Sequence, residues 1–225
     1  PPCVPNKRMA AANSFFFIWT TPPETFLPRH LRAIESICFW HRDAAIRGLS
    51  NTLPLDFFSA LSEACDIRIE RYDLAKLVQN HPAEVWYEFR RYWSRSAYFS
   101  NHEADLLRLL RLRAVGGVYV DVDVIFLRPF RLGAGCINAI GIESGGGGLS
   151  AAQAATADRY PSYERNRHDH AIVCNAVMRF AAGTPLLERA LDTFVREYVP
   201  LTPGYTASGI LNVLACCLAC CRITP

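Results

Sequence analysis

Segments that read as strands and segments that read as helices alternate through the first 130 residues of this 225-residue chain, and no other feature restricts the fold as much. The run SFFFIWTT is apolar and aromatic almost throughout, as in a strand buried on both faces. The patterns predict strands over 14–21, 43–51 and 67–73, and helices over 27–41, 55–65 and 104–115. This alternation favours an α/β sandwich whose sheet is mainly parallel and covered by helices on both faces.

The order of elements breaks down over 144–170, where a Gly- and Ala-rich stretch is followed by polar residues, and we expect a long mobile loop there. Order resumes in AIVCNAVMRFA, and PLLERALDTFVREY predicts an amphipathic helix over 185–198. A chain of this length can bury the core of one domain, which we place over 1–225.

Charge and hydropathy exclude several classes of protein. Lys and Arg total 24 against 21 acidic residues, and no basic run is interleaved with aromatic residues, so nucleic acid is not an expected partner. The longest apolar run, ILNVLACCLACC, is too short to cross a bilayer, and no signal peptide is recognisable. Because the chain does not begin with Met, we interpret it as a piece of a longer protein that could carry a membrane anchor elsewhere.

The nine cysteines leave the pairing open, because an odd number cannot pair completely within one chain and no repeated disulfide spacing is visible. A secretory compartment is permitted. The CCLACC segment (216–221) lacks a second C-x2-C pair at zinc-finger distance, so we interpret it as part of a buried helix. The HDH motif (168–170) could bind metal but is expected to be simply exposed, and SGGGG lacks the strand and lysine of a phosphate loop.

The stretch GGVYVDVDVIF (116–126) alternates at period two, as a strand with two different faces does. One face carries Val118, Val120, Val122 and Val124, and the other carries Tyr119, Asp121 and Asp123. Neighbouring residues on one face of a strand lie roughly 6.6 Å apart, so the two carboxylates could share a divalent cation only if the strand bends or the side chains converge. The alternative is a solvated acidic face, since Asp-x-Asp is common by chance.

The helix that precedes this stretch has its own signals. Ser100 and Glu103 have the spacing of a capping box, and Gly116–Gly117 can supply a left-handed C-terminal cap. Asp105 and Arg108 lie at i and i+3 on a common side. They form either a local ion pair of a few tenths of a kcal/mol or, beside the two aspartates, part of a functional site.

Several blocks of the chain, in order, resemble one family of enzymes. They are FFFIWTT, AIESICFWH, TLPLDFF, YDL and the long block WYEFRRYWSRSAYFSNHEADLLRLLRLRAVGGVYVDVDVIFLRPF. Together they are similar to the α-1,4-galactosyltransferase and α-1,4-N-acetylglucosaminyltransferase family. The sugar-binding region of that family is similar in turn to yeast initiating mannosyltransferases and clostridial glucosylating toxins.

The resemblance implies a metal-dependent, retaining transferase of the GT-A type that uses a UDP-sugar with Mn²⁺ or Mg²⁺. By resemblance, Asp123 is a direct metal ligand, and Asp121 holds the nucleotide ribose and reaches the metal. Asp105 and Arg108 contact the donor sugar and diphosphate. Asn175 occupies a polar position that either faces the donor and acceptor or marks a junction between a strand and a helix.

The nucleotide site is expected to be lined by Ile18, Trp19 and Thr20. The resemblance also implies a nucleotide-sugar half over 13–130, an acceptor-side half over 131–215, a glycan or glycolipid acceptor, and the Golgi lumen of a type II membrane protein. The family's closing W-G-x-N-G-P loop is altered in PGYTASGILNV (203–213), and the C-terminus looks truncated. Two alternatives therefore remain open: an inactive relative that keeps the nucleotide pocket, and a plain α/β binding protein.

Overall fold

A single mixed sheet organises the chain. A computed structural model describes residues 14–132, 136–143, 172–196, 198 and 221–223. Seven strands of these residues form the sheet in the order β3-β2-β1-β4-β6-β5-β7. The strands are β1 (Ser14–Ile18), β2 (Ala45–Leu49), β3 (Asp66–Glu70), β4 (Gly117–Val120), β5 (Ala139–Glu143), β6 (Ile172–Phe180) and β7 (Cys221–Ile223).

Parallel pairing dominates, as the alternation of elements predicted. β1 pairs in parallel with β2 and β4, β2 with β3, and β5 with β7. β6 is the exception, because it runs antiparallel to both β4 and β5. The α/β fold with a mainly parallel sheet is therefore confirmed.

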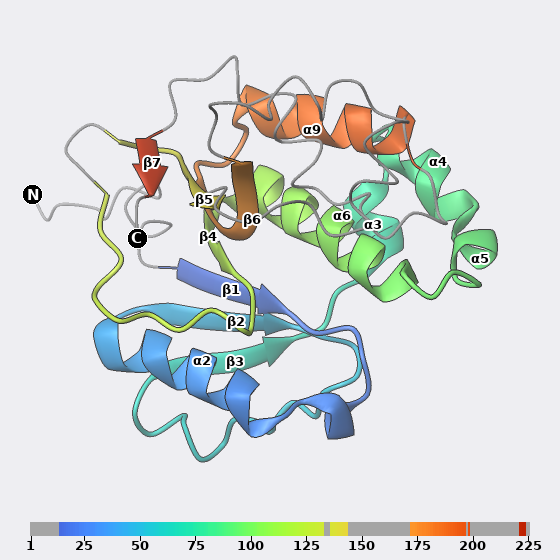
Figure 1. Ribbon diagram of the computed structural model, residues 1–225. Helices are drawn as coiled ribbons and strands as arrows, with labels where there is room; N and C mark the ends of the chain where they lie inside the picture. The colour runs from blue at the N-terminus through green and yellow to red at the C-terminus, as the bar shows by residue number, and fades with distance from the viewer. Residues whose placement is uncertain (1–13, 133–135, 144–171, 197, 199–220, 224–225) are drawn as a thin grey trace, which may run out of the picture.

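Helices cover both faces of the sheet (Figure 1). The helical elements are η2 (Pro23–Thr25), α2 (Pro28–Trp40), α3 (Leu74–Val78), α4 (Ala83–Glu88), α5 (Arg90–Trp93), α6 (Phe99–Val115) and α9 (Pro185–Arg196). α2 covers one face, over β1 to β3, and contributes Ile34 and Ile37 to a core with Phe17 and Ile46. α6 and α9 cover the other face.

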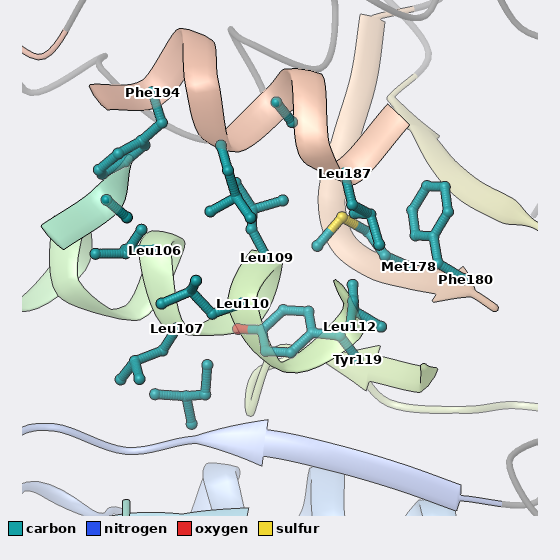
Figure 2. Packing of buried hydrophobic residues seen from close by; sticks show 14 of the residues in the cluster. Leu106, Leu107, Leu109, Leu110, Leu112, Tyr119, Met178, Phe180, Leu187 and Phe194 are labelled. Atoms are coloured by element: carbon teal, nitrogen blue, oxygen red, sulfur yellow. The ribbon is translucent and has the colours of Figure 1, made fainter. Parts of the chain in front are cut away.

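α6 is buried on nearly every side because it lies between the sheet and α9 (Figure 2). Its fully buried side chains are Leu106, Leu107, Leu109, Leu110 and Leu112. Burial of each leucine contributes about 2 kcal/mol relative to exposure. α6 is therefore a rigid support for the two charged residues that it also carries, Asp105 and Arg108.

Most predicted elements are confirmed, but the helix over 55–65 is wrong. The segment forms consecutive turns. The Ser59 amide donates to the Asp56 carbonyl, and the Leu61 amide donates to the Phe58 carbonyl. The reason is tertiary packing: the adjacent rings of Phe57 and Phe58 both contact Phe26, at 5.2 and 5.6 Å between centroids. Successive residues of an α-helix point about 100° apart and would separate these rings.

The capping box before the central helix is also wrong. α6 begins at Phe99, so Ser100 lies inside its first turn, and the side chain of the capping residue, Tyr98, makes no capping hydrogen bond. The carboxylate of Glu103 instead accepts a hydrogen bond of 3.2 Å from the hydroxyl of Tyr72. The helix is stabilised at this end by packing and not by a local cap.

Two cysteines that the sequence left unassigned are joined. Cys38 of α2 and Cys65, just before β3, form a disulfide that closes 27 residues. The predicted loop over 144–170, the HDH motif and the altered stretch 203–213 lie outside the described residues. Of the CCLACC segment only Cys221 is described, and it begins β7, so the helical interpretation is wrong at that residue.

The glycine predicted to cap α6 supports a stability prediction. Gly116 has φ of 69° and ψ of −162°, a region essentially restricted to glycine, and a Cβ there would lie 2.7 Å from the carbonyl oxygen of Phe180. Gly183 has a similar φ of 68°, but a Cβ would meet nothing within 4 Å. We expect Gly116→Ala to lower the free energy of unfolding by about 3 kcal/mol and Gly183→Ala by about 1 kcal/mol. Denaturant unfolding checks this, and equal losses would contradict the clash.

Candidate active site

The predicted site residues converge where β1 and β4 end side by side. The chain runs outward from β1 to β2 and β3 and then crosses back to form β4 on the other side of β1, so the strand order reverses between β1 and β4. A crevice at such a point is the usual ligand site of an open α/β sheet. Ile18 ends β1, and the amide of Trp19 still bonds the carbonyl of Leu49 in the neighbouring strand. The Thr20 hydroxyl donates to the Ser100 carbonyl at 3.4 Å, which ties this end of β1 to α6.

A cluster of charged side chains lies between α6 and β4. Arg108 Nη2 is 3.1 Å from Asp105 Oδ1, and Arg108 Nη1 is 3.4 Å from Asp121 Oδ1. The Arg108 side chain is 9% exposed and that of Asp105 4%, so this pair is shielded from solvent. The i, i+3 pair predicted from the sequence exists, but it belongs to a buried network and not to the surface of a helix.

β6 completes the cluster from the opposite side. Asn175 Nδ2 donates to Asp105 Oδ1 at 3.2 Å, and the Asn175 carbonyl accepts from Arg108 Nη1 at 3.2 Å. The Asp121 amide donates to the carbonyl of Ala176 at 2.8 Å. Residues far apart in sequence thus position one another.

β4 ends earlier than its sequence pattern predicted. The strand stops at Val120, and the amide of Val124 bonds the carbonyl of Asp121 in a turn. The Asp-x-Asp pair is therefore on a bend and not on a continuous strand, because the chain leaves the sheet there. A bend at this point is one of the two conditions under which both carboxylates could bind the same cation.

Burial and neighbouring charges set the protonation of the site. Burial raises the pKa of Asp121. The charge of Arg108 and the hydrogen bond from the Tyr119 hydroxyl lower this pKa, whereas the charges of Asp123 and Asp105 raise it. The balance is a raised pKa, in a cluster where the carboxylates of Asp105 and Asp121 contact one guanidinium and the charge of Asp123 acts on Asp121. Burial also raises the pKa of Tyr119 well above its usual value, so its hydroxyl keeps its proton. An excess of negative charge in a partly dry site favours a cation.

The residues present could supply only part of the coordination shell of a hard divalent cation. In the described ranges no three His, Cys, Asp or Glu side chains are grouped to hold a metal ion. Mg²⁺ and Mn²⁺ are, however, commonly bound by one or two carboxylates, with substrate phosphates and water completing the shell. Asp121, whose side chain is 30% exposed, and Asp123, which is exposed, supply such a pair.

Trp19 and Thr20 lie beside the charged cluster and not in it. The Trp19 ring packs on Phe26 and His30 at 4.8 and 4.9 Å between centroids, and its buried Nε1 has no partner among the described residues. Tyr119 is the cluster residue that sequence reasoning missed. The signal was present, because Tyr119 stands two positions before Asp121 on the same face of the strand.

The fold is of the GT-A type found in solved glycosyltransferases, and the charged cluster lies at the carboxyl end of its strand β4. The solved PaToxG glycosyltransferase matches it with a TM-score of 0.57, covering 93% of this chain and 79% of that one, at 13% identity. The apo-form glycosyltransferase GlyE of Streptococcus pneumoniae TIGR4 gives a TM-score of 0.51 over 91% and 43% of the two chains, also at 13% identity. These similarities concern the fold alone.

The chain belongs to the family described as the glycosyltransferase sugar-binding region containing the DXD motif, which it matches over residues 28–145. It is 34% identical over 134 residues to an uncharacterised protein of Arabidopsis thaliana, covering 57% of this chain and 20% of that protein. It is 27% identical over 146 residues to lactosylceramide 4-alpha-galactosyltransferase of Rattus norvegicus, covering 61% and 39%. The chain therefore spans well under half the length of these curated relatives.

Proposed function

We propose that the protein is a metal-dependent, retaining hexosyltransferase that moves galactose or N-acetylglucosamine from a UDP-sugar to a glycan or glycolipid acceptor. The observation that carries the proposal is the cluster of Asp105, Arg108, Asp121 and Asn175 at the carboxyl ends of β1 and β4, with Asp123 exposed beside it. The galactosyltransferase relative favours a galactose donor and a glycolipid acceptor by its name.

Asp121 and Asp123 would hold the divalent cation, since both carboxylates lie on the bend after β4. When bound, the cation supplies Lewis-acid stabilisation of the negative charge that develops on the departing diphosphate. Arg108 adds positive charge from the interior, and the segment Ile18–Thr20 would line the nucleotide at the end of β1. Asp105 and Asn175 would orient the donor sugar.

Neither carboxylate of the DXD motif is proposed as a nucleophile. Retaining glycoside hydrolases use a carboxylate that attacks the sugar directly. Here Asp121 is engaged by Arg108, and both DXD carboxylates are assigned to metal and nucleotide. Retention would therefore come from how donor and acceptor are oriented in the pocket, without a covalent bond to either residue.

We further propose that the protein functions in the Golgi lumen. The Cys38–Cys65 disulfide supports an oxidising compartment, because such bonds are rare where thiols are kept reduced. Among the described residues no helix is both long and apolar enough to cross a membrane.

Calorimetric titration with UDP, with and without Mn²⁺, tests the proposed function. We expect binding that depends on Mn²⁺, followed by hydrolysis or transfer when a UDP-sugar replaces UDP. Binding without any turnover would indicate an inactive relative that keeps the pocket. An absence of heat in both conditions would contradict nucleotide-sugar chemistry and leave a plain α/β binding protein.

A further inference from the structure

Tyr119 has its side chain in a fixed place inside the site. It lies on β4, which pairs with β1 on one side and β6 on the other. The residue is 2% exposed, and its ring packs against Phe16 at 5.3 Å between centroids. Figure 2 shows the ring under α6, between the helix and the sheet. Because the ring is enclosed, its hydroxyl cannot move away from its partner without disturbing the core.

That partner is the first aspartate of the DXD motif. The Tyr119 hydroxyl donates a hydrogen bond to Asp121 Oδ1. Arg108 lies over the same ring, with its guanidinium carbon 4.5 Å from the ring centre, and its Nη1 lies 3.4 Å from the same Oδ1. The Tyr119 hydroxyl and the guanidinium that lies over the Tyr119 ring therefore both contact one oxygen of this carboxylate.

The second carboxylate oxygen of Asp121, Oδ2, takes part in neither of these contacts. Within the described part of the chain, both contacts of this carboxylate end on Oδ1, which leaves Oδ2 for a ligand. The side chain is still 30% exposed, so a ligand can reach it. The chain also turns directly after β4, and a carboxylate on a turn would otherwise sample several rotamers.

We propose that Tyr119 is a positioning residue that fixes Asp121 so that Oδ2 is presented to the metal and nucleotide. Tyr119 does not touch the ligand itself. The inference rests on the metal-dependent UDP binding proposed above. A charge-assisted hydrogen bond to the carboxylate oxygen that does not bind the metal orients the carboxylate in advance. Less side-chain entropy is then lost when the metal binds.

The variant Tyr119→Phe tests this role because it keeps the ring under Arg108 and removes only the hydroxyl. We expect the Mn²⁺ concentration that half-saturates UDP binding to rise about tenfold, the lower end of what loss of such an orienting partner costs. UDP affinity at saturating Mn²⁺ should return to the wild-type value. Calorimetric titration of UDP over a series of Mn²⁺ concentrations measures both.

Tyr72→Phe is the matched control, since it removes another partly buried tyrosine hydroxyl that donates to a carboxylate, that of Glu103. It should leave the Mn²⁺ midpoint unchanged. An unchanged midpoint in folded Tyr119→Phe, or equal shifts in both variants, would overturn the positioning role. If Tyr119→Phe does not fold, Arg108→Lys replaces the planar guanidinium that contacts the same Oδ1 with a single ammonium, and the midpoint must rise. A wild type without Mn²⁺-dependent binding would instead overturn the proposed function.

Discussion

Replacing Asp123 with alanine should reduce Mn²⁺-dependent UDP binding and sugar transfer by about 100-fold or more. The proposed role of this carboxylate is direct metal coordination, and a metal at a departing phosphate contributes several kcal/mol. Each 1.36 kcal/mol corresponds to a factor of ten, so loss of about 3 kcal/mol gives the expected factor. Calorimetry with UDP at several Mn²⁺ concentrations and a transfer assay with UDP-galactose would measure the two effects.

The fold should survive the Asp123 substitution, because the side chain is exposed. Its melting temperature should therefore match that of the wild type. Asp56→Ala is a suitable control, since Asp56 is exposed and lies in the turns after β2. Asp123→Ala protein that binds UDP with an unchanged dependence on Mn²⁺ would rule out Asp123 as a metal ligand.

Replacing Arg108 with alanine should lower the free energy of unfolding by about 3–5 kcal/mol. Arg108 Nη2 lies 3.1 Å from Asp105 Oδ1, and the Asp105 side chain is 4% exposed. Removing Arg108 takes away the positive charge that it places beside this buried carboxylate and also removes its contacts to Asp121 and Asn175. Urea denaturation followed by circular dichroism measures the change.

Arg189→Ala is the control for the Arg108 prediction. Arg189 is exposed on α9, and a substitution at such a site usually changes stability by less than about 0.5 kcal/mol. If Arg108→Ala loses no more stability than this control, the ion pair is not an important part of the native structure. The double variant Asp105→Asn with Arg108→Ala should recover part of the loss, because the buried negative charge beside Arg108 is then removed as well.

The parts of the site that lie close together in sequence were predictable, and the others were not. Helical spacing put Asp105 and Arg108 on one side of α6, and the period-two alternation put Tyr119 of β4 and Asp121, just after it, on the same side of the chain. The bond of 3.2 Å between Asn175 and Asp105 spans 70 residues, and no periodicity encodes such a distance. Only the resemblance to a family pointed to Asn175.

The wrong predictions also come from contacts between residues that are far apart in sequence. The residues at 55–65 have helical spacing, but contacts of Phe57 and Phe58 with Phe26 override it. The end of β4 at Val120 depends on where its partners β1 and β6 stop pairing, which is a property of the sheet and not of the valine pattern. Local propensity therefore predicted the presence of elements better than their ends.

Because β6 lies beside β4, the charged cluster forms only when β6 has paired with β4 in the sheet. A chain ending before residue 172 would lack one of the two pairing partners of β4 and expose that edge of the strand to pairing with other chains. It would also lack the Asn175 carbonyl that binds Arg108 and the Ala176 carbonyl that holds the Asp121 backbone. During synthesis the first 130 residues therefore cannot assemble the charged cluster alone. The cluster is complete only when β6 has been made and has paired with β4.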